Sequence, residues 1–339
     1  MRYSPILFLI IIGIIAGGCI PLTTQTDQQI PYEDASLIMK SCRAENVSCK
    51  GAFIQVINET EDYVYCAFYD LDLIDLISAI NEKDADVKVV LETENAIILK
   101  KPTVYDYNSA LMHDKFCVSE KAMVTGSFNP TINGEFFNDN FIIISNSSLI
   151  RQNYITEFSQ LYDTKIRATP NPLINISGVL IENYFCPQDD CEEHVLKTLN
   201  ASKESIQFLT FSFTSNPIGE LLIEKKKEGV TITGVFEKRQ NSKFSQYSKL
   251  KSAGMDVRFD TNPKTMHHKL FIIDNTTVIV GSYNPTKSAN ERNNENLFII
   301  HDPAKAIIAQ QEFIRVWQAS SLPEESKTNE TDIADVNAE

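Results

Sequence analysis

Two histidine–lysine pairs are the most reactive features of this 339-residue chain. His113 and Lys115 form the first pair, and His267 and Lys269 form the second. A neutral imidazole is both a nucleophile and a proton carrier near neutral pH, and a lysine ammonium neutralises an anion. Attack on an anionic phosphate ester needs a positioned nucleophile, a proton for the leaving oxygen and cations for the other oxygens. Two such pairs, brought together, would supply all three.

Each pair opens the same longer pattern. A β-rich run follows each lysine, then an acidic residue in a polar turn, a second β-rich run and a Gly-Ser-x-Asn sequence. A single His-x-Lys would be read as ordinary surface residues, but chance does not explain a long pattern that occurs twice. Two β-rich runs around a polar turn predict a hairpin, in which His and Lys share one face. The shared positions are Glu120, Gly126, Ser127 and Asn129 in the first copy, and Asp274, Gly281, Ser282 and Asn284 in the second.

Strand and helix signals alternate around both copies, which favours an α/β layered fold built from two repeats. The predicted strands are 63–70 and 87–93 in the first repeat and 206–213 and 230–237 in the second. The predicted helices are 73–82, 192–203 and 218–228, and amphipathic segments 151–162 and 304–318 close the repeats.

The doubled pattern resembles the HKD signature of the phospholipase D superfamily. The likeness covers about residues 40–318, and residues 237–260 resemble the matching stretch of the superfamily's small endonucleases and mitochondrial cardiolipin hydrolases. One departure is Glu120, which stands where the family usually has Asp. The resemblance implies two phospholipase-D-like repeats, each a β-sheet flanked by helices. A pseudo-twofold axis would relate them, with the active site between.

The same resemblance implies a role for each motif residue. One imidazole attacks phosphorus and forms a phosphohistidine, and the other protonates the leaving group and then activates water; in many relatives the N-terminal copy attacks, which favours His113. Glu295 and Asp139 would each hydrogen-bond an imidazole, with Glu295 orienting His267. The expected phosphate-binding residues are Lys115, Lys269, Ser127, Asn129, Ser282 and Asn284, and the expected structural residues are Glu120, Asp274, Gly126 and Gly281. We expect no metal or other cofactor, because the sequence holds no evident metal-ligand cluster or Gly-rich phosphate loop. His194, His268 and His301 are expected to have no part in the chemistry.

The N-terminus is typical of an exported protein. Residues 1–18 read as a signal peptide, and small residues before Cys19 resemble the site at which lipoproteins are cleaved and lipidated. An uncleaved anchor and an ordinary secreted protein are the alternatives, and all three place the chain outside the cell. The expected division is a linker at 19–35, repeats at 36–168 and 169–320, and an acidic, disordered tail at 321–339.

Cysteine spacing also indicates an oxidising compartment. Cys42 and Cys49, and then Cys186 and Cys191, occupy comparable places in the two repeats and predict local disulfides. A four-cysteine zinc site is the alternative, although neither spacing is typical of one. Cys66 and Cys117 fall on predicted strands, and we expect both side chains to face a core. They would be either free thiols or a third disulfide.

Charge leaves two substrate classes open. The net charge of −14 argues mildly against a general nucleic-acid binder, although residues 225–251 are locally basic. A phospholipid near a bilayer is slightly favoured, an extracellular endonuclease is the alternative, and a phosphate-binding protein without turnover is a third reading. Because both motif copies lie in one chain, we expect a monomer.

Overall fold

The computed structural model describes residues 29–43, 47–95 and 97–320. The expected signal peptide, Cys19 and the acidic tail lie outside the described residues. Within the described ranges, none of the helices is both long enough and apolar enough to cross a membrane.

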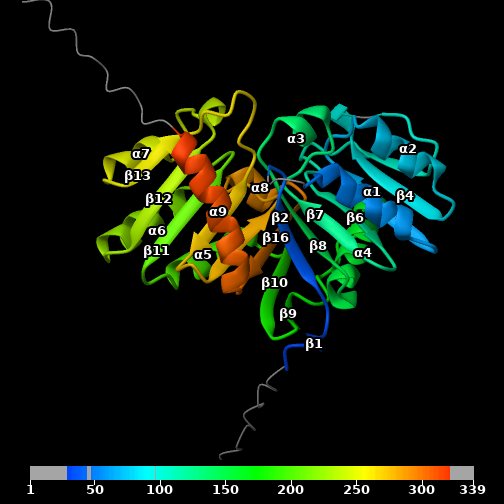
Figure 1. The fold of residues 1–339 in the computed structure, drawn as a ribbon, viewed down its shortest axis with the longest axis horizontal. Coiled ribbons are helices and arrows are strands. Elements are labelled where there is room, and N and C mark those ends of the chain that lie inside the picture. Colours follow the sequence, from blue (N-terminus) through cyan, green and yellow to red (C-terminus); the bar gives the residue numbers. More distant parts are fainter. Residues whose placement is uncertain (1–28, 44–46, 96, 321–339) are drawn as a thin grey trace, which may run out of the picture.

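Two mixed β-sheets, one from each repeat, form the scaffold (Figure 1). The seven-stranded sheet has the order β2-β8-β7-β6-β3-β4-β5. Strand β1 (Tyr32–Glu33) precedes this repeat and joins the other sheet. The repeat comprises β2 (Leu37–Ser41), α1 (Cys49–Glu59), β3 (Tyr63–Phe68), α2 (Ile74–Glu82), β4 (Asp86–Glu92), the 3₁₀ turn η1 (Thr93–Asn95), β5 (Thr103–Asp106), β6 (Lys115–Ser119), β7 (Met123–Gly126), α3 (Ile132–Phe136), β8 (Phe141–Ser145) and α4 (Ser148–Asp163).

The nine-stranded sheet has the order β1-β9-β10-β16-β15-β14-β11-β12-β13. Its repeat comprises β9 (Leu173–Ile176), β10 (Val179–Cys186), α5 (Cys191–Asn200), β11 (Ser205–Thr210), α6 (Asn216–Lys227), β12 (Thr231–Phe236), the 3₁₀ turn η2 (Lys238–Gln240), α7 (Tyr247–Ser252), β13 (Asp256–Phe259), β14 (Lys269–Ile273), β15 (Thr277–Gly281), α8 (Lys287–Glu291), β16 (Glu295–Ile300) and α9 (Pro303–Ala319). The two-repeat α/β fold expected from the sequence is therefore present.

The sequence explains where the motif elements begin and end. Each His-x-Lys pair leads into a strand that starts at the lysine, and the two strands of each copy pair as an antiparallel hairpin. Thr131 and Thr286, which follow the shared Asn-Pro, cap the short helices α3 and α8 by accepting a hydrogen bond from the backbone N–H three residues on. The predicted helices and strands of both repeats appear within a few residues of their expected bounds.

One apolar core holds the two repeats together. It contains Phe116 and Tyr154 from the first repeat and Phe185 and Phe298 from the second, all buried. The Tyr154 ring centroid lies 5.0 Å from those of Phe116 and Phe185. Two further cores fill the outer faces, under α1 and α2 in one repeat and under α5, α6 and α7 in the other (Figure 1). Burial of large aromatic rings between the sheets fixes the repeats relative to each other.

The expected linker differs from the structure at its C-terminal end. Tyr32 and Glu33 form β1, which pairs in parallel with β9 of the second repeat. The expected boundary after residue 168 falls between α4 and β9.

Three disulfides tie the described residues. Cys42 is bonded to Cys49, and Cys186 to Cys191, in the local pairing expected from the spacing. Cys66 and Cys117, for which the sequence left two states open, form a third disulfide between directly opposed residues of β3 and β6. Three disulfides fit an exported protein.

Candidate active site

Both motif histidines face one cavity of about 370 Å³ that residues of both repeats line. His113 and His267 are 7% and 6% exposed, so each imidazole is largely removed from water but open to the cavity. A larger cavity of about 690 Å³ contains no histidine and lies elsewhere, beside α4 and Pro187. The residues that line the histidine cavity are Tyr69, Leu111, His113, Asn129, Asn138, Phe211, Ser212, Gln240, Thr265, His267, Asn284, Thr286, Ala289 and Asn293.

Backbone pairing between the repeats places the two histidines. The His113 N–H donates to the Asn294 carbonyl at 3.0 Å, and the His267 N–H donates to the Asp139 carbonyl at 2.9 Å. Met112 and Asn294, and likewise Asp139 and Met266, form isolated parallel bridges. The entry to each motif strand in one repeat is thus held by the backbone of the other repeat, which is how residues far apart in sequence reach one cavity.

His113 is oriented by a carboxylate of the second repeat. Its Nδ1 lies 2.7 Å from Oε2 of Glu295, which also accepts a hydrogen bond from the Ser282 hydroxyl at 2.7 Å. The carboxylate fixes the ring and leaves Nε2 as the nitrogen without this partner. Burial raises the pKa of Glu295 to about 8, although Lys115 opposes the shift.

His267 is oriented by neutral acceptors instead. Its Nδ1 lies 2.9 Å from the Ser127 carbonyl oxygen and 3.0 Å from Oδ1 of Asn140. A backbone carbonyl only accepts, so Nδ1 carries the proton and Nε2 is unprotonated in the neutral ring. The two histidines therefore have opposite surroundings, one beside a carboxylate and one beside amide oxygens.

The histidine pKa values are lowered by burial and by nearby cations. Burial, followed by the charges of Lys115 and Lys269, holds the pKa of His113 well below its usual range. The pKa of His267 is likewise held low by burial and the two lysines. Both imidazoles are therefore neutral in the empty site at neutral pH, the form a nucleophile requires.

The two lysines lie beneath the histidines and are as deeply buried. Burial lowers the pKa of Lys115 to about 8 and that of Lys269 well below its usual range. The Lys269 ammonium donates to the His267 carbonyl at 2.9 Å, and Lys115 contacts the His113 carbonyl in the same way. A bound phosphate anion would favour the charged form of each ammonium, so substrate binding and lysine protonation reinforce each other.

An aromatic ring stands beside each histidine–lysine pair. The Tyr69 centroid lies 4.9 Å from that of His113, and the Phe211 centroid lies 4.7 Å from that of His267. The Lys115 and Lys269 ammonium groups lie 5.1 and 4.7 Å from the centroids of the same two rings. The motif did not predict these rings, although both residues lie near the end of a predicted strand. The observed strands end just before them, at Phe68 and Thr210.

Two expected carboxylate contacts are wrong. Glu295 contacts His113 rather than His267, because β16 reaches across to the other repeat. Asp139 contacts neither imidazole, and the position equivalent to Glu295 is Asn140, one residue further on. Counting the same number of residues from Gly126 and from Gly281 would have found this amide.

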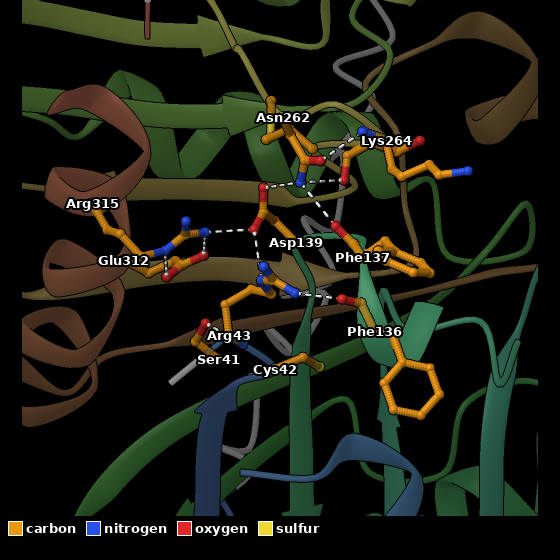
Figure 2. Close-up of polar contacts among 12 residues, drawn as sticks. Ser41, Cys42, Arg43, Phe136, Phe137, Asp139, Asn262, Lys264, Glu312 and Arg315 are labelled. Carbon is orange, nitrogen blue, oxygen red and sulfur yellow. Dashed lines mark hydrogen bonds and ion pairs between the residues drawn. The ribbon is translucent and has the colours of Figure 1, made fainter. Parts of the chain in front are cut away.

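Asp139 instead joins a polar network with Arg315 and Asn262 (Figure 2). Its carboxylate accepts from Arg315 at 2.6 Å and from Asn262 at 2.7 Å. Arg315 also donates to Glu312 at 2.6 Å, and Glu312 lies 2.8 Å from Nε2 of His268. His268 is not among the residues that line the cavity, and its contact with Glu312 makes it the last member of this network.

The two motif serines also differ from their expected role. Ser127 donates to Asn140 at 3.0 Å, as Ser282 donates to Glu295, and both hydroxyls are fully buried away from the cavity lining. Both hydroxyls donate to the partners of the histidines, so the structure gives them a positioning role in place of the phosphate binding expected for them. Asn129 and Asn284 do line the cavity.

The turn acids lie far from the chemistry. The Glu120 carboxylate accepts from Thr60 and from the Glu61 N–H at 2.7 Å, and Asp274 accepts from three backbone N–H groups at 203–205, each at 2.8 Å. These bonds lower the pKa of Glu120 to about 2 against the effect of burial. Gly126 and Gly281 permit close strand contact, since a Cβ would lie 2.1 and 2.3 Å from a carbonyl oxygen of the neighbouring strand.

The other expected bystanders have structural partners. His194 stacks on Tyr184 with centroids 3.5 Å apart, and His301 lies 2.8 Å from Glu182. In the part of the chain that the structure describes, no three His, Cys, Asp or Glu side chains converge in a way that could hold a metal ion.

Comparisons with known proteins agree with this geometry. The family model described as "Cardiolipin synthase, PLD-like domain" matches residues 195–317. A phospholipase D of Rickettsia prowazekii is 30% identical over 152 residues, which is 43% of this chain and 74% of that protein. The mitochondrial cardiolipin hydrolase of Xenopus tropicalis is 31% identical over 155 residues, which is 44% of this chain and 74% of that protein.

A solved structure shares the whole two-repeat fold. The phosphatidylserine synthase of Haemophilus influenzae superposes with a TM-score of 0.64 at 11% identity, covering 85% of this chain and 87% of that one. This likeness shows the fold alone, and the sequence matches show the family. The chain is thus a member of the phospholipase D superfamily and a phosphodiester hydrolase of that superfamily.

Proposed function

We propose that this protein hydrolyses a phosphodiester through a covalent histidine intermediate. The observation that carries the proposal is that both imidazoles open on one cavity while each Nδ1 is engaged by an acceptor. In the first step Nε2 of His113 forms a bond to phosphorus, the bond from phosphorus to the leaving oxygen breaks, and protonated His267 gives its proton to that oxygen. In the second step His267 takes a proton from water, the water oxygen bonds to phosphorus, and the phosphorus–nitrogen bond breaks.

The assignment of His113 as nucleophile follows from its partner. The positive charge that the ring acquires when Nε2 bonds to phosphorus favours the ionised form of Glu295, and the resulting carboxylate on Nδ1 stabilises that charge. The amide and carbonyl oxygens beside His267 offer less stabilisation to an imidazolium, so protonated His267 is the stronger acid of the two. This reason differs from the order of the motifs in the chain but favours the same histidine.

Lys115 and Lys269 would bind the non-bridging oxygens of the phosphodiester, with Asn129 and Asn284 at the cavity wall. The charge of the bound substrate would also help to keep His267 protonated for the first step, because an anion beside the ring offsets the two lysine charges. This part of the proposal rests on residues of the chain alone and invokes no metal.

A phospholipid is the favoured substrate. Apart from the two histidines, the cavity is lined by amides, hydroxyls, aliphatic side chains and aromatic rings, and no lysine or arginine is part of the lining. A groove for nucleic acid would instead need cations along the path of the backbone. Proteins named phospholipase D and mitochondrial cardiolipin hydrolase are among its relatives. Lipidation of Cys19 would hold the protein at the outer face of the cell membrane, beside such a substrate.

The competing candidate is an extracellular endonuclease, which the basic run 225–251 favours. In the structure this run is spread over the end of α6, η2 and α7, and Lys225 is buried against the Asn200 carbonyl. Only Gln240 of the run lines the cavity. This arrangement supports the lipid over the nucleic acid.

The test is a side-by-side assay of the exported protein on a chromogenic phosphodiester, plasmid DNA, RNA and phospholipid vesicles, with and without EDTA. We expect turnover of the chromogenic diester and the phospholipid that persists in EDTA and disappears in His113→Asn. Cleavage of DNA or RNA alone would assign the endonuclease. Phosphate binding without turnover of any substrate would leave only a binding function, and loss of activity in EDTA would reject the metal-free mechanism.

A further inference from the structure

The surface beside the cavity mouth differs sharply between the two repeats. Helix α3 lies between cavity residues Asn129 and Asn138 in the chain, so both ends of the helix adjoin the cavity mouth. Its outward positions are apolar, with Ile132, Phe136 and Phe137 exposed by 53%, 55% and 45%. In Figure 1 this helix lies at an outer edge of the molecule.

The second repeat shows that the fold does not require these residues. Counting from Gly126 and from Gly281, the equivalents of Ile132, Phe136 and Phe137 are Lys287, Glu291 and Arg292, which are also exposed. Both short helices have the same threonine cap and the same hydrogen bond at the end, from Phe137 to Asn133 and from Arg292 to Ser288. Charged residues thus satisfy the fold at these positions, so the apolar set in α3 has another cause.

Two cations contact the apolar residues at the end of α3, and a third lies beside one of them. Lys264 lies 5.6 Å from the centroid of the Phe137 ring, and Arg43 donates to the Phe136 carbonyl at 2.7 Å. Arg239 donates at 2.6 Å to the carbonyl of Pro263, next to Lys264. Figure 2 shows Lys264 lying along Phe137 and the Phe136 ring turned away from the polar network.

The carboxylates that pair with Arg43 and Arg239 do not reach the surface. Asp139 and Glu237, which contact Arg43 and Arg239, are 3% and 2% exposed. Glu135 of α3 turns toward α1, where it accepts from the Ser48 hydroxyl at 2.7 Å and the Lys50 N–H at 2.8 Å. What reaches solvent beside the mouth is therefore apolar at the centre and cationic at the rim.

We infer that Ile132, Phe136, Phe137, Arg43, Arg239 and Lys264 form a docking surface for an anionic phospholipid bilayer. Exposed aliphatic and aromatic side chains with a basic rim have the chemistry of segments that rest in the headgroup layer of a membrane. Because Asn129 and Asn138 flank α3, insertion of this helix would bring the cavity mouth to the depth of the lipid phosphodiester. This inference rests on the proposed function in its phospholipid form.

A single-stranded nucleic acid is the alternative occupant that exposed aromatic rings suggest. Such a site uses ring faces as stacking platforms along a basic groove. Here the Phe136 and Phe137 rings meet edge to face, with centroids 6.4 Å apart, and an isoleucine completes the set. The geometry favours insertion among lipids over base stacking.

The test measures vesicle flotation and hydrolysis for the whole exported protein and for Phe136→Ser/Phe137→Ser. The vesicles are phosphatidylcholine alone or mixed with anionic phosphatidylglycerol. Because two half-exposed rings would lose their burial in the membrane, we expect vesicle binding and vesicle hydrolysis to fall at least about tenfold. Hydrolysis of a short-chain phospholipid in monomeric form should stay within about twofold of the parent, because the cavity itself is unchanged.

Two further variants control for misfolding and for a general effect of exposed apolar side chains. Phe136→Glu places at this position the residue that the second repeat carries, so it should fold and should repel anionic vesicles. Ile98→Ser/Ile166→Ser removes two exposed apolar side chains elsewhere, which are 94% and 85% exposed, and should bind vesicles as the parent does.

The outcomes separate this inference from the proposed function. Unchanged vesicle binding in both Phe variants, with phospholipid hydrolysis intact, overturns the docking surface alone. Vesicle binding that depends on the rings, in a protein that cleaves no phospholipid in any form, overturns the phospholipid function while the surface stands. Oligonucleotide binding is measured in parallel. If the Phe variants lose oligonucleotide binding and keep vesicle binding, a lipid is rejected as the occupant.

Discussion

The Glu295 carboxylate lies 2.7 Å from Nδ1 of His113, a histidine of the other repeat, while the equivalent of Glu295 in the first repeat is the amide Asn140. The two histidines therefore occupy equivalent positions in the two repeats but have chemically different hydrogen-bond partners. One imidazole has a carboxyl partner and the other has amide and carbonyl partners, and Glu295 and Asn140 each accept from a buried serine hydroxyl. This difference leads to the first three predictions.

Replacing Glu295 by Gln should lower kcat by about 100-fold or more, because the amide no longer offsets the charge that forms on His113. Steady-state kinetics on the chromogenic diester measure this loss. Glu120→Gln is the matched control and should leave most activity, since that carboxylate accepts from Thr60 and from the N–H groups of Glu61 and Tyr63, away from the cavity. Equal losses in the two variants at equal thermal stability would contradict the roles assigned to these residues.

Asn140→Asp should give His267 a carboxylate partner and raise its pKa. Because the first step needs protonated His267, the alkaline limb of the bell-shaped pH–rate profile should move up by about one pH unit. The acid limb, which reports neutral His113, should stay in place. An alkaline limb that does not move would show that His267 is not the acid.

Acid quench during turnover should trap phosphate on His113, because that ring forms the phosphorus–nitrogen bond. In His267→Asn the water-activating group is missing, so with a good leaving group the trapped fraction should rise while turnover slows. Peptide mapping by mass spectrometry locates the phosphate. Phosphate found on His267 would reverse the two assignments.

Asp114, next to His113, should make stability fall as pH rises. Burial raises its pKa to about 7, whereas a carboxyl in the unfolded chain ionises near pH 3.9. Between these values the folded state keeps a proton that the unfolded state has lost, so this contribution to stability is full below the lower pKa and is lost as pH rises through the upper one. Asp114→Asn lacks this dependence.

The free energy of unfolding of Asp114→Asn, relative to the parent, should therefore increase from about pH 4 to pH 7 and then level off. Denaturant melts at a series of pH values measure it. Asp84→Asn, at an exposed position, is the control and should show no such trend. A constant difference across this range for Asp114→Asn would contradict the prediction.

Specific activity should not depend on protein concentration. Both histidine–lysine pairs come from one chain and face one cavity, so a single molecule holds the complete site. Activity per mole measured across a dilution series, with mass determined by light scattering, tests this. A rise in activity that follows a monomer–dimer transition would count against it.

Local spacing was enough to predict much of the fold. The repeated motif, the alternating strands and helices and the two short-range disulfides all depend on residues close together in the chain. Spacing could not predict contacts that cross between repeats. Glu295 follows the second motif, so the sequence suggested His267 as its partner, and only the backbone pairing of Asn294 with His113 shows otherwise.

The site residues that were misjudged share one physical cause. Whether a polar side chain faces the cavity or the layer behind it depends on how strands from two repeats meet. Ser127 and Ser282 lie behind the histidine partners, and Asp139 points to Arg315, while their neighbours Asn140 and Asn129 face the imidazole and the cavity. Neighbouring residues in extended backbone point their side chains in opposite directions. The motif sequence alone does not show which direction leads to the cavity, because this depends on the strand of the other repeat that lies beside it.

The paired bridges Met112–Asn294 and Asp139–Met266 have a consequence for the folding of the chain. The backbone beside each histidine is hydrogen-bonded to the opposite half, so neither half alone holds its imidazole in the position seen at the cavity. If hydrolysis needs both imidazoles in these positions, a chain whose halves have not yet docked lacks the complete site. In an exported hydrolase, which the three disulfides fit, this dependence would spare the phosphodiesters of the producing cell until the two halves have docked.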